Sequence, residues 1–184
     1  TSITQEELLK ADETKLIDRL YQEVISSYNQ HKEELQKQSI PVFKNIRLTQ
    51  GSGIENVIVP FTDGRKGYNV LANLTKTLDT GGVELSQALE RSVTLAVIDE
   101  NWKEHLRAMD DLKQSVQTAY LEQKDPLVIY KMEAYQLFRN MNADVNRNIV
   151  NFLCHATLPT QQQEAGLREG RQQRTDMSRM RANK

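Results

Sequence analysis

Two runs with helical periodicity, joined by a short polar segment, constrain the fold of this 184-residue chain more than any other feature. Residues 98–138 read IDENWKEHLRAMDDLKQSVQTAYLEQKDPLVIYKMEAYQLF. In each run apolar residues recur every three or four positions, which places them on one helix face. We therefore expect two long helices packed in antiparallel fashion. The apolar faces consist of Leu95, Ile98, Trp102, Leu106, Met109, Leu112 and Val116 in the first run and Tyr130, Ala134, Leu137, Met141, Val145, Ile149 and Phe152 in the second.

The turn between the two runs is marked by Asp125 and Pro126. Asp125 suits the N-cap of the second helix, and Pro126 suits its first helical residue, where the missing N–H costs no hydrogen bond. No proline interrupts residues 61–125 or 127–158. Because an α-helix rises about 1.5 Å per residue, an arm of about 30 residues reaches roughly 45 Å. Such a hairpin is long enough to probe a cavity well away from its base.

Composition and charge narrow the classes of protein to which the chain can belong. Its 38% apolar and 27% charged residues are ordinary for a soluble globular protein of one large or two small domains. A formal net charge of −1 gives no overall field for nucleic acid, so no nucleic-acid partner is expected. The sequence has no apolar run of about 18 residues and does not open on a basic-then-apolar stretch, so we expect neither a membrane span nor a signal peptide in it. The single cysteine, Cys154, favours a reducing compartment.

Helical signals also open the chain. Thr4 and Glu7 have the spacing of a capping box, which predicts a short helix ending near residue 11. Asp12 can cap a second helix, which we expect to end near residue 38. The chain begins at Thr1 without a methionine, so we expect it to be part of a longer protein.

The pattern changes after Pro41, which is expected to end the second helix. Alternating residues at 42–48 and 56–61 predict two strands of a small β hairpin, and a short helix is expected over 68–78. The pair Gly81-Gly82 then marks a domain boundary. From residue 160 onward, six basic residues against three acidic ones give a net charge of +3, typical of a solvated helix or a mobile tail.

No residue stands in a recognisable catalytic, cofactor or metal setting. Asp99 and Glu100 follow an apolar run, as in a magnesium-binding strand of an ATPase, but the sequence has no glycine-rich phosphate loop. His31, His105 and His155 are scattered, and zinc sites need several ligands around one point. We therefore expect no catalytic residue, no bound cofactor and no metal in this chain.

The hairpin motif resembles a known family. The run WKEHLRAMDDLKQSV at 102–116, then EQKDPLVIYK at 122–131 and an aromatic-rich helix, resembles the two-helix finger of SecA, the ATP-driven motor of bacterial protein export. Residues 1–82 resemble its helical wing domain, and 83–158 resemble the following part of its helical scaffold domain. Residues 159–184 are then a polar, basic C-terminal tail. The segment IENVIVPFTDGRKGYNV resembles the version found in the Bacteroides group.

The resemblance implies a mainly α fold, in which a long antiparallel two-helix hairpin joins a smaller helical wing subdomain that contains a short β hairpin. It implies a fragment of a protein-export motor whose wing and finger contact unfolded preprotein and the SecY channel. ATP and Mg would be bound by domains of the parent protein outside this chain, so the fragment by itself would not be an enzyme. The implied partners include the remaining domains of the motor and an anionic membrane surface. The implied location is cytoplasmic, peripherally associated with the inner membrane.

The resemblance also implies a role for the tip of the hairpin. In the family an aromatic residue, commonly tyrosine, contacts the translocating polypeptide at this tip. Counting back from Asp125-Pro126, that position falls on Leu121, and Tyr120 is one residue earlier. Either residue can supply adaptable apolar contact, and Tyr120 can instead fold back over the helix ends. The expected contact residues are Tyr120, Leu121, Glu122, Gln123 and Lys124, and the expected packing residues are Trp102, Leu106, Met109, Leu112, Val116, Leu137 and Met141.

A second interpretation belongs to another class of protein. A stand-alone helical adaptor can bind a protein partner through the same hairpin, with no motor attached. The surrounding reading frame separates the two interpretations. A preceding segment with a phosphate loop and helicase-type motifs supports the motor, and a start codon just before Thr1 supports the adaptor.

Overall fold

The computed structural model describes residues 12–50, 53–116, 125–158 and 168–169. Within these ranges the chain is mainly α, as expected, with a small antiparallel sheet. The elements in chain order are α2 (Glu13–Gln50), β1 (Asn56–Thr62), β2 (Gly67–Asn73), α3 (Leu74–Asp79), α4 (Val83–Val116), α5 (Pro126–His155) and β3 (Arg168–Glu169).

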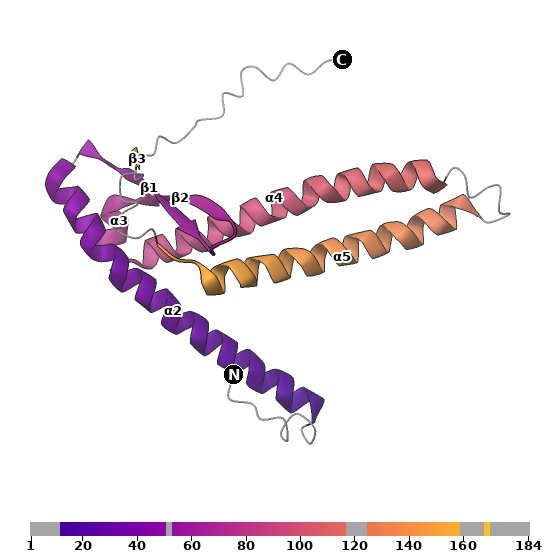
Figure 1. The fold of residues 1–184 in the computed structure, drawn as a ribbon, viewed down its shortest axis with the longest axis horizontal. Helices are drawn as coiled ribbons and strands as arrows, with labels where there is room; N and C mark the ends of the chain where they lie inside the picture. The colour runs from indigo at the N-terminus through magenta and orange to yellow at the C-terminus, as the bar shows by residue number, and fades with distance from the viewer. Residues whose placement is uncertain (1–11, 51–52, 117–124, 159–167, 170–184) are drawn as a thin grey trace, which may run out of the picture.

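Helices α4 and α5 lie side by side, run in opposite directions and form a long antiparallel hairpin (Figure 1). The sheet and α3 lie at the base of this hairpin, and the distal parts of α4 and α5 extend beyond them. The C-terminal half of α2 crosses the base, whereas its N-terminal half points away from the hairpin. The long antiparallel hairpin expected from the two apolar patterns is therefore confirmed.

The β1–β2 hairpin is closed by a turn that Asp63 stabilises. Its carboxylate oxygen Oδ1 accepts hydrogen bonds from the backbone N–H groups of Arg65 and Lys66, at 2.8 and 2.7 Å. The backbone N–H of Lys66 is the main reason that the pKa of Asp63 lies below its ordinary value. The turn brings Phe61 opposite Tyr68 in the sheet register.

The other edge of β1 is met by the chain that follows α5. Thr62 and Thr157 exchange two backbone hydrogen bonds, of 3.2 and 2.8 Å, and β3 pairs with β1 at Val57 and Ile58. Along an antiparallel strand the backbone N–H and C=O groups of successive residues point to opposite edges. The backbone of Pro60 therefore points to the same edge as that of Thr62, away from β2. A proline is tolerated there, since it removes no bond of the β1–β2 ladder.

The prediction of a strand over 42–48 is wrong, because α2 continues through Pro41 to Gln50. Local rules disfavour a proline inside a helix, since it removes one hydrogen bond and crowds the preceding turn. Burial outweighs them here: Leu35, Ser39 and Phe43 follow one another at four-residue spacing and are 8%, 1% and 2% exposed. The strand at 56–61 is correct, but its partner is β2.

The helix expected over 68–78 is also wrong in its first half. Residues up to Asn73 belong to β2, and the short helix α3 begins only at Leu74. Val70 and Ala72 point into the core and are 0% exposed, so alternation along a strand buries them as effectively as a helix would. Asn73 ends the strand and caps α3 at the same time.

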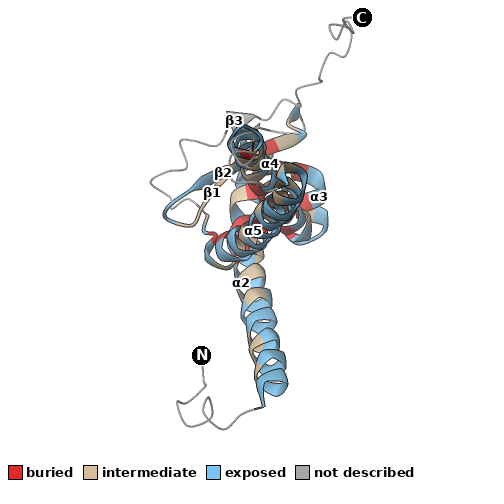
Figure 2. Cartoon of the chain, turned by 90° about the vertical axis from the view of Figure 1, so that its right-hand side faces the viewer, coloured by how far each residue is buried: buried red, intermediate tan, exposed pale blue. Residues whose placement is uncertain are grey.

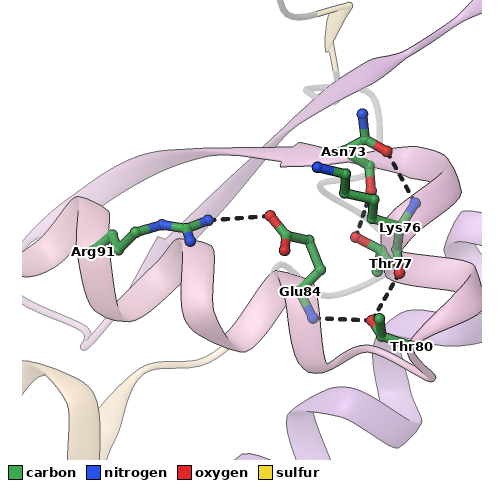
Figure 3. A network of polar contacts seen from close by, with 6 residues as sticks. All are labelled: Asn73, Lys76, Thr77, Thr80, Glu84 and Arg91. Carbon is green, nitrogen blue, oxygen red and sulfur yellow. Dashed lines mark hydrogen bonds and ion pairs between the residues drawn. The ribbon is translucent and has the colours of Figure 1, made fainter.

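A network of polar contacts fixes the corner between α3 and α4 (Figure 3). The side-chain oxygen of Asn73 accepts from the Lys76 N–H at 2.9 Å, and the Thr80 hydroxyl donates to the Lys76 carbonyl at 2.7 Å. The same hydroxyl accepts from the Glu84 N–H at 3.1 Å, so it joins the end of α3 to the start of α4. Arg91 then pairs with the Glu84 carboxylate at 3.1 Å. The corner sets the direction in which the hairpin leaves its base.

Gly82 completes this corner for a steric reason. Its φ of +94° is a conformation that side chains with a Cβ rarely adopt. A Cβ at this position would also lie 3.0 Å from Cα of Gln36 in α2. Only glycine therefore allows α2 to approach the start of α4 so closely. The expected domain boundary after this glycine pair, and the division of the chain into domains 1–82, 83–158 and 159–184, remain predictions.

The hydrophobic core lies where the hairpin base, the sheet and the C-terminal half of α2 meet (Figure 2). Among its most buried side chains are Phe43, Phe61, Val70, Leu74, Leu85, Val93 and Phe152. The N-terminal half of α2 lies outside this core, with Ile17 and Tyr21 57% and 61% exposed. The short helix expected before residue 12 falls outside the described residues.

Candidate functional site

The hairpin of α4 and α5 is the candidate functional site. At the start of α5 the Asp125 carboxylate accepts a 2.9 Å hydrogen bond from the Leu127 N–H, and Pro126 occupies the first turn. The expected N-cap is therefore confirmed. The cap fixes the start of α5, where Pro126 and Leu127 line the same hollow as Val116, the last residue of α4.

The seam between the two arms is formed by a subset of the apolar residues. Val116, Val145 and Phe152 are 8%, 8% and 3% exposed, so they lie inside it at the distal end, the middle and the base. The structure leaves Met109, Leu112, Leu137 and Met141 half-buried along the same seam. These residues are positioned to hold the arms together along their length.

Trp102 and Leu106 differ from what the apolar pattern predicts. Their exposed fractions are 45% and 48%, so they lie at the edge of the seam and not within it. Leu95 and Ile98, from the same predicted face, are 68% and 44% exposed. The expectation that Trp102 and Leu106 pack inside the hairpin is therefore corrected. Seven apolar positions spread over one face give a stripe wider than a single partner helix can cover.

These exposed residues belong to a larger surface, which we call the apolar flank. Successive residues of a helix are rotated by about 100°, so the four exposed residues of α4 fall within about 80° of arc. Four exposed residues of α5 fall within about 120° of arc on the same side of the antiparallel pair. The apolar flank consists of Leu95, Ile98, Trp102 and Leu106 from α4 and Val128, Met132, Tyr135 and Phe138 from α5.

Aromatic contacts link the two halves of the apolar flank. The ring of His105 lies 5.4 Å from the Trp102 ring and 6.0 Å from the Phe138 ring, measured between centroids. The second contact crosses from α4 to α5, so both arms contribute to one continuous surface. On α5 the Arg139 guanidinium lies 5.9 Å from the centroid of the Tyr135 ring. The α5 half of this surface was missed by sequence reasoning, although 128, 132, 135 and 138 show helical spacing.

Contacts between side chains tie the hairpin base to the sheet. The Tyr68 ring packs edge-on against Phe152 at 4.8 Å, and Lys66 forms an ion pair with Glu100 at 2.7 Å. The hydrogen bond to Glu100 is the main reason that the pKa of Lys66 is raised. Burial raises the pKa of the Tyr68 hydroxyl, and the Glu100 charge adds to this effect. Together with the Thr62–Thr157 bonds, these contacts make the base a single packed unit.

A second set of contacts joins α2 to the hairpin. Glu90 of α4 accepts hydrogen bonds from the Tyr28 hydroxyl at 2.8 Å and from Lys32 Nζ at 2.7 Å. His31 Nε2 lies 2.8 Å from the backbone oxygen of Ala156, just after α5. Burial, followed by the hydrogen bond to Glu90, raises the pKa of Tyr28. The contacts hold α2 at a fixed position on both arms.

The residues expected at the tip, Tyr120, Leu121, Glu122, Gln123 and Lys124, lie outside the described residues. In the last described turns of the two arms, one hollow is lined by Lys113, Val116, Pro126, Leu127 and Tyr130. Leu127 is 58% exposed there. The apolar surface of the hairpin therefore reaches the distal end of the described part.

In the ranges that the structure describes, no group of three or more His, Cys, Asp or Glu side chains is placed to hold a metal ion. Over the same ranges, none of the helices combines the length and apolar character needed to cross a membrane.

The model of the SecA Wing and Scaffold domain family matches residues 2–157 of the chain. Among curated proteins, the chain is 43% identical over 182 residues to the protein translocase subunit SecA of Cytophaga hutchinsonii, covering 99% of the chain and 16% of that protein. It is 40% identical over 191 residues to the subunit of the same name from Bacteroides fragilis, covering 98% of the chain and 17% of that protein.

A third relative, from Flavobacterium psychrophilum and also described as protein translocase subunit SecA, is 40% identical over 160 residues, which is 87% of the chain and 14% of that protein. The chain thus spans about a sixth of the length of these relatives. No solved structure matches the chain.

Proposed function

The chain belongs to the SecA Wing and Scaffold family, and from this premise we propose that it is the wing and two-helix finger of a SecA-type protein-export motor. In this proposal the finger contacts unfolded preprotein and the SecY channel. ATP, with Mg, is bound and hydrolysed by domains of the longer parent protein. The fragment works at the cytoplasmic side of the inner membrane, where the parent associates peripherally, and an anionic lipid surface is a further partner.

The observation that carries the proposal is the hairpin itself, stiffened along its seam and exposed along its apolar flank. Val116 and Val145 close the seam, while a packed base anchors the arms through Phe152 and Glu100. A rigid pair of helices held at one end can transmit a displacement of its base to its tip. The mechanical role therefore needs no catalytic group in this chain.

The apolar flank supports a role in assembly with the remaining domains of the motor. An exposed apolar surface of this extent on one side of a hairpin usually marks a contact with another protein surface. Trp102, Tyr135 and Phe138 are residue types that often dominate the energy of such contacts. We therefore assign the apolar flank to packing against other parts of the parent protein, and the tip to the polypeptide and the channel.

Site-specific crosslinking in the full-length parent protein tests the tip assignment. A photo-crosslinking residue at position 120 or 121 should capture preprotein or the channel during ATP-driven transport. Glu104, whose side chain is 73% exposed on the shaft of the hairpin, provides a matched control position. Capture from the wing alone, with none from 120 or 121, would refute the assignment.

A second experiment tests whether the apolar flank packs against other domains of the parent protein or only stabilises the fold of this fragment. The double change Trp102→Ala and Phe138→Ala should leave this fragment folded, because both side chains are about half exposed. In the parent protein the same changes should weaken domain packing and lower ATP-dependent transport. Changing the paired surface residues Glu104 and Arg107 to alanine is the control, since exposed ion pairs contribute little. Unchanged transport in the aromatic variant would contradict the assignment.

A further inference from the structure

The outer edge of β1 is met twice by the chain that follows α5, in two different registers. Near the turn of the hairpin, Thr157 pairs with Thr62 through two backbone hydrogen bonds. Further along the same edge, Arg168 of β3 pairs with Ile58. β3 therefore lies at one edge of the sheet, with β1 between it and β2 (Figure 1). Both contacts run antiparallel to β1, so one edge receives two separate parts of the chain.

Two prolines account for the separation of these contacts. If the register of the first contact continued along β1, Pro159 would stand opposite Pro60, and Gln161 would stand opposite Ile58. Neither proline has an N–H, so a pair of them at this edge would lose both hydrogen bonds of that position. A continuous strand is therefore disfavoured. The chain instead meets the edge again where Arg168 lies opposite Ile58.

The contact at β3 depends on the backbone of one residue. Backbone directions alternate along β1, so the N–H and C=O of Ile58 point towards β3, whereas those of Val57 and Val59 point towards β2. Arg168 is therefore the residue that exchanges hydrogen bonds with Ile58, and the N–H of Glu169 points away from β1. With two residues, β3 is shorter than a usual strand of about five or six. Such a short contact can open locally while the rest of the fold stays intact.

The contact at Thr157 is held more firmly. Thr157 follows closely on α5, which ends at His155, and Phe152 in the last turn of this helix is 3% exposed in the core. The hydroxyl of Thr157 adds a third hydrogen bond, of 3.0 Å, to the backbone carbonyl of Thr62. Opening this contact would disturb the packed base of the hairpin, whereas opening the contact at β3 would not.

We propose that β3 is a strap that docks on the outer edge of β1 and opens independently of the rest of the fold. When it is docked, it pairs with the backbone of Ile58 and closes this edge to other extended segments. When it is open, the edge is free while β1 stays paired with β2. The strap is held by the main chain of Arg168 and needs no particular side chain there. The inference does not rest on the proposed transport function, because it concerns other residues.

Amide hydrogen exchange of the ¹⁵N-labelled 184-residue chain, followed by nuclear magnetic resonance, tests independent opening. The Ile58 amide should exchange at least about tenfold faster than the Val59 amide, because Val59 is paired with Val70 of β2 and Ile58 with β3. The Thr62 amide, which is bonded to Thr157, should also exchange more slowly than that of Ile58. Equal rates at Ile58 and Val59 would mean that β3 opens only together with the sheet, which would overturn the proposal.

Variants of the full 184-residue chain test the main-chain contact. Arg168→Pro removes the N–H that faces Ile58 and should speed exchange of the Ile58 amide to the rate of an unstructured peptide, without changing the helical circular dichroism. Glu169→Pro is the matched control, because the N–H of Glu169 points away from β1 and its loss costs no bond. Arg168→Ala removes the side chain but keeps the N–H, and it should also leave Ile58 protected. Equal exchange at Ile58 in Arg168→Pro and in the unchanged chain would show that β3 does not hold this edge.

A free peptide tests whether the docked strap closes the edge. The probe is acetyl-Glu-Ala-Gly-Leu-Arg-Glu-Gly-Arg-amide, which reproduces residues 164–171. A short link gives a tethered segment an effective concentration in the millimolar range, so a strap that is mostly docked implies a dissociation constant of about 1 mM or less for the free peptide. The peptide should shift the backbone signals of Ile58 in the Arg168→Pro variant, and it should bind the unchanged chain at least about tenfold more weakly, because the tethered strap competes. Equal binding to both chains, or to neither, would overturn the proposal.

Discussion

The Tyr28 hydroxyl donates a 2.8 Å hydrogen bond to the Glu90 carboxylate, across 62 positions of sequence. Lys32, one helical turn further along α2, reaches the same oxygen at 2.7 Å. Both donors are partly buried, so the carboxylate is held in an environment where its hydrogen bonds are stronger than at an open surface. This cluster is the main polar link between α2 and the hairpin.

Tyr28→Phe should lower the free energy of unfolding by about 1 kcal/mol, because one hydrogen bond is lost while Lys32 still neutralises Glu90. Because the pKa of Tyr28 is raised in the folded protein, its contribution is fully present below about pH 10 and is lost as the pH rises above that value. Urea denaturation at pH 7 measures the effect. Tyr21→Phe is the control, since Tyr21 is 61% exposed and should show almost no change.

Leu89→Ala and Leu106→Ala compare a core position and a flank position on the same helix. Leu89 is 3% exposed, so its truncation should cost about 2 to 5 kcal/mol. Leu106 is 48% exposed, so the same truncation should cost about 1 kcal/mol or less in this fragment. Thermal and urea unfolding of the two variants provide the measurement. Equal losses would mean that Leu106 is covered in solution.

Gly82→Ala should destabilise the fold by about 1 kcal/mol or more. The positive φ is unfavourable for alanine, and the added methyl group would meet Gln36 of α2 at 3.0 Å. Gly53→Ala is the matched control, since a Cβ there has no neighbour within 4 Å among the described residues. Comparison of the two melting temperatures checks the prediction. A neutral effect at Gly82 would show that α2 moves away from this corner easily.

Cys154 should react slowly with iodoacetamide at pH 8. Burial raises the pKa of its thiol, which lowers the fraction of reactive thiolate and also limits access. Unfolding the chain in urea should increase the alkylation rate several-fold, and mass spectrometry can follow the single modification. Equal rates in the folded and unfolded chain would show that the fold does not shield the Cys154 thiol.

The sequence predicts the hairpin well because its signals are local. Asp125 and Pro126 define the start of α5 through capping and backbone geometry, which depend on neighbouring residues alone. The continuation of α2 past Pro41 was missed because its cause is tertiary. Phe43 is buried against elements far along the chain, and this burial outweighs the local effect of the proline.

The sequence could not separate the seam from the apolar flank. Residues in both recur at three- and four-residue spacing, so Leu106 and Met109 look alike in a helical pattern. Their roles differ because the partner helix covers only part of a wide apolar stripe, and the covered part depends on how the two arms rotate about their axes. The strand partner of 56–61 was also missed: a strand was expected over 42–48 and a helix over 68–78, whereas residues 67–73 form the partner strand β2.

Pro60 has a consequence for how copies of this chain meet one another. Sheets tend to recruit foreign strands along any edge that offers an unbroken row of donors and acceptors. Along β1 that row is interrupted at Pro60, next to the stretch already occupied by Thr157. This side of β1 is filled by β3 at Val57 and Ile58 and by Thr157 beyond Pro60, so it should not recruit a strand from another copy of the chain.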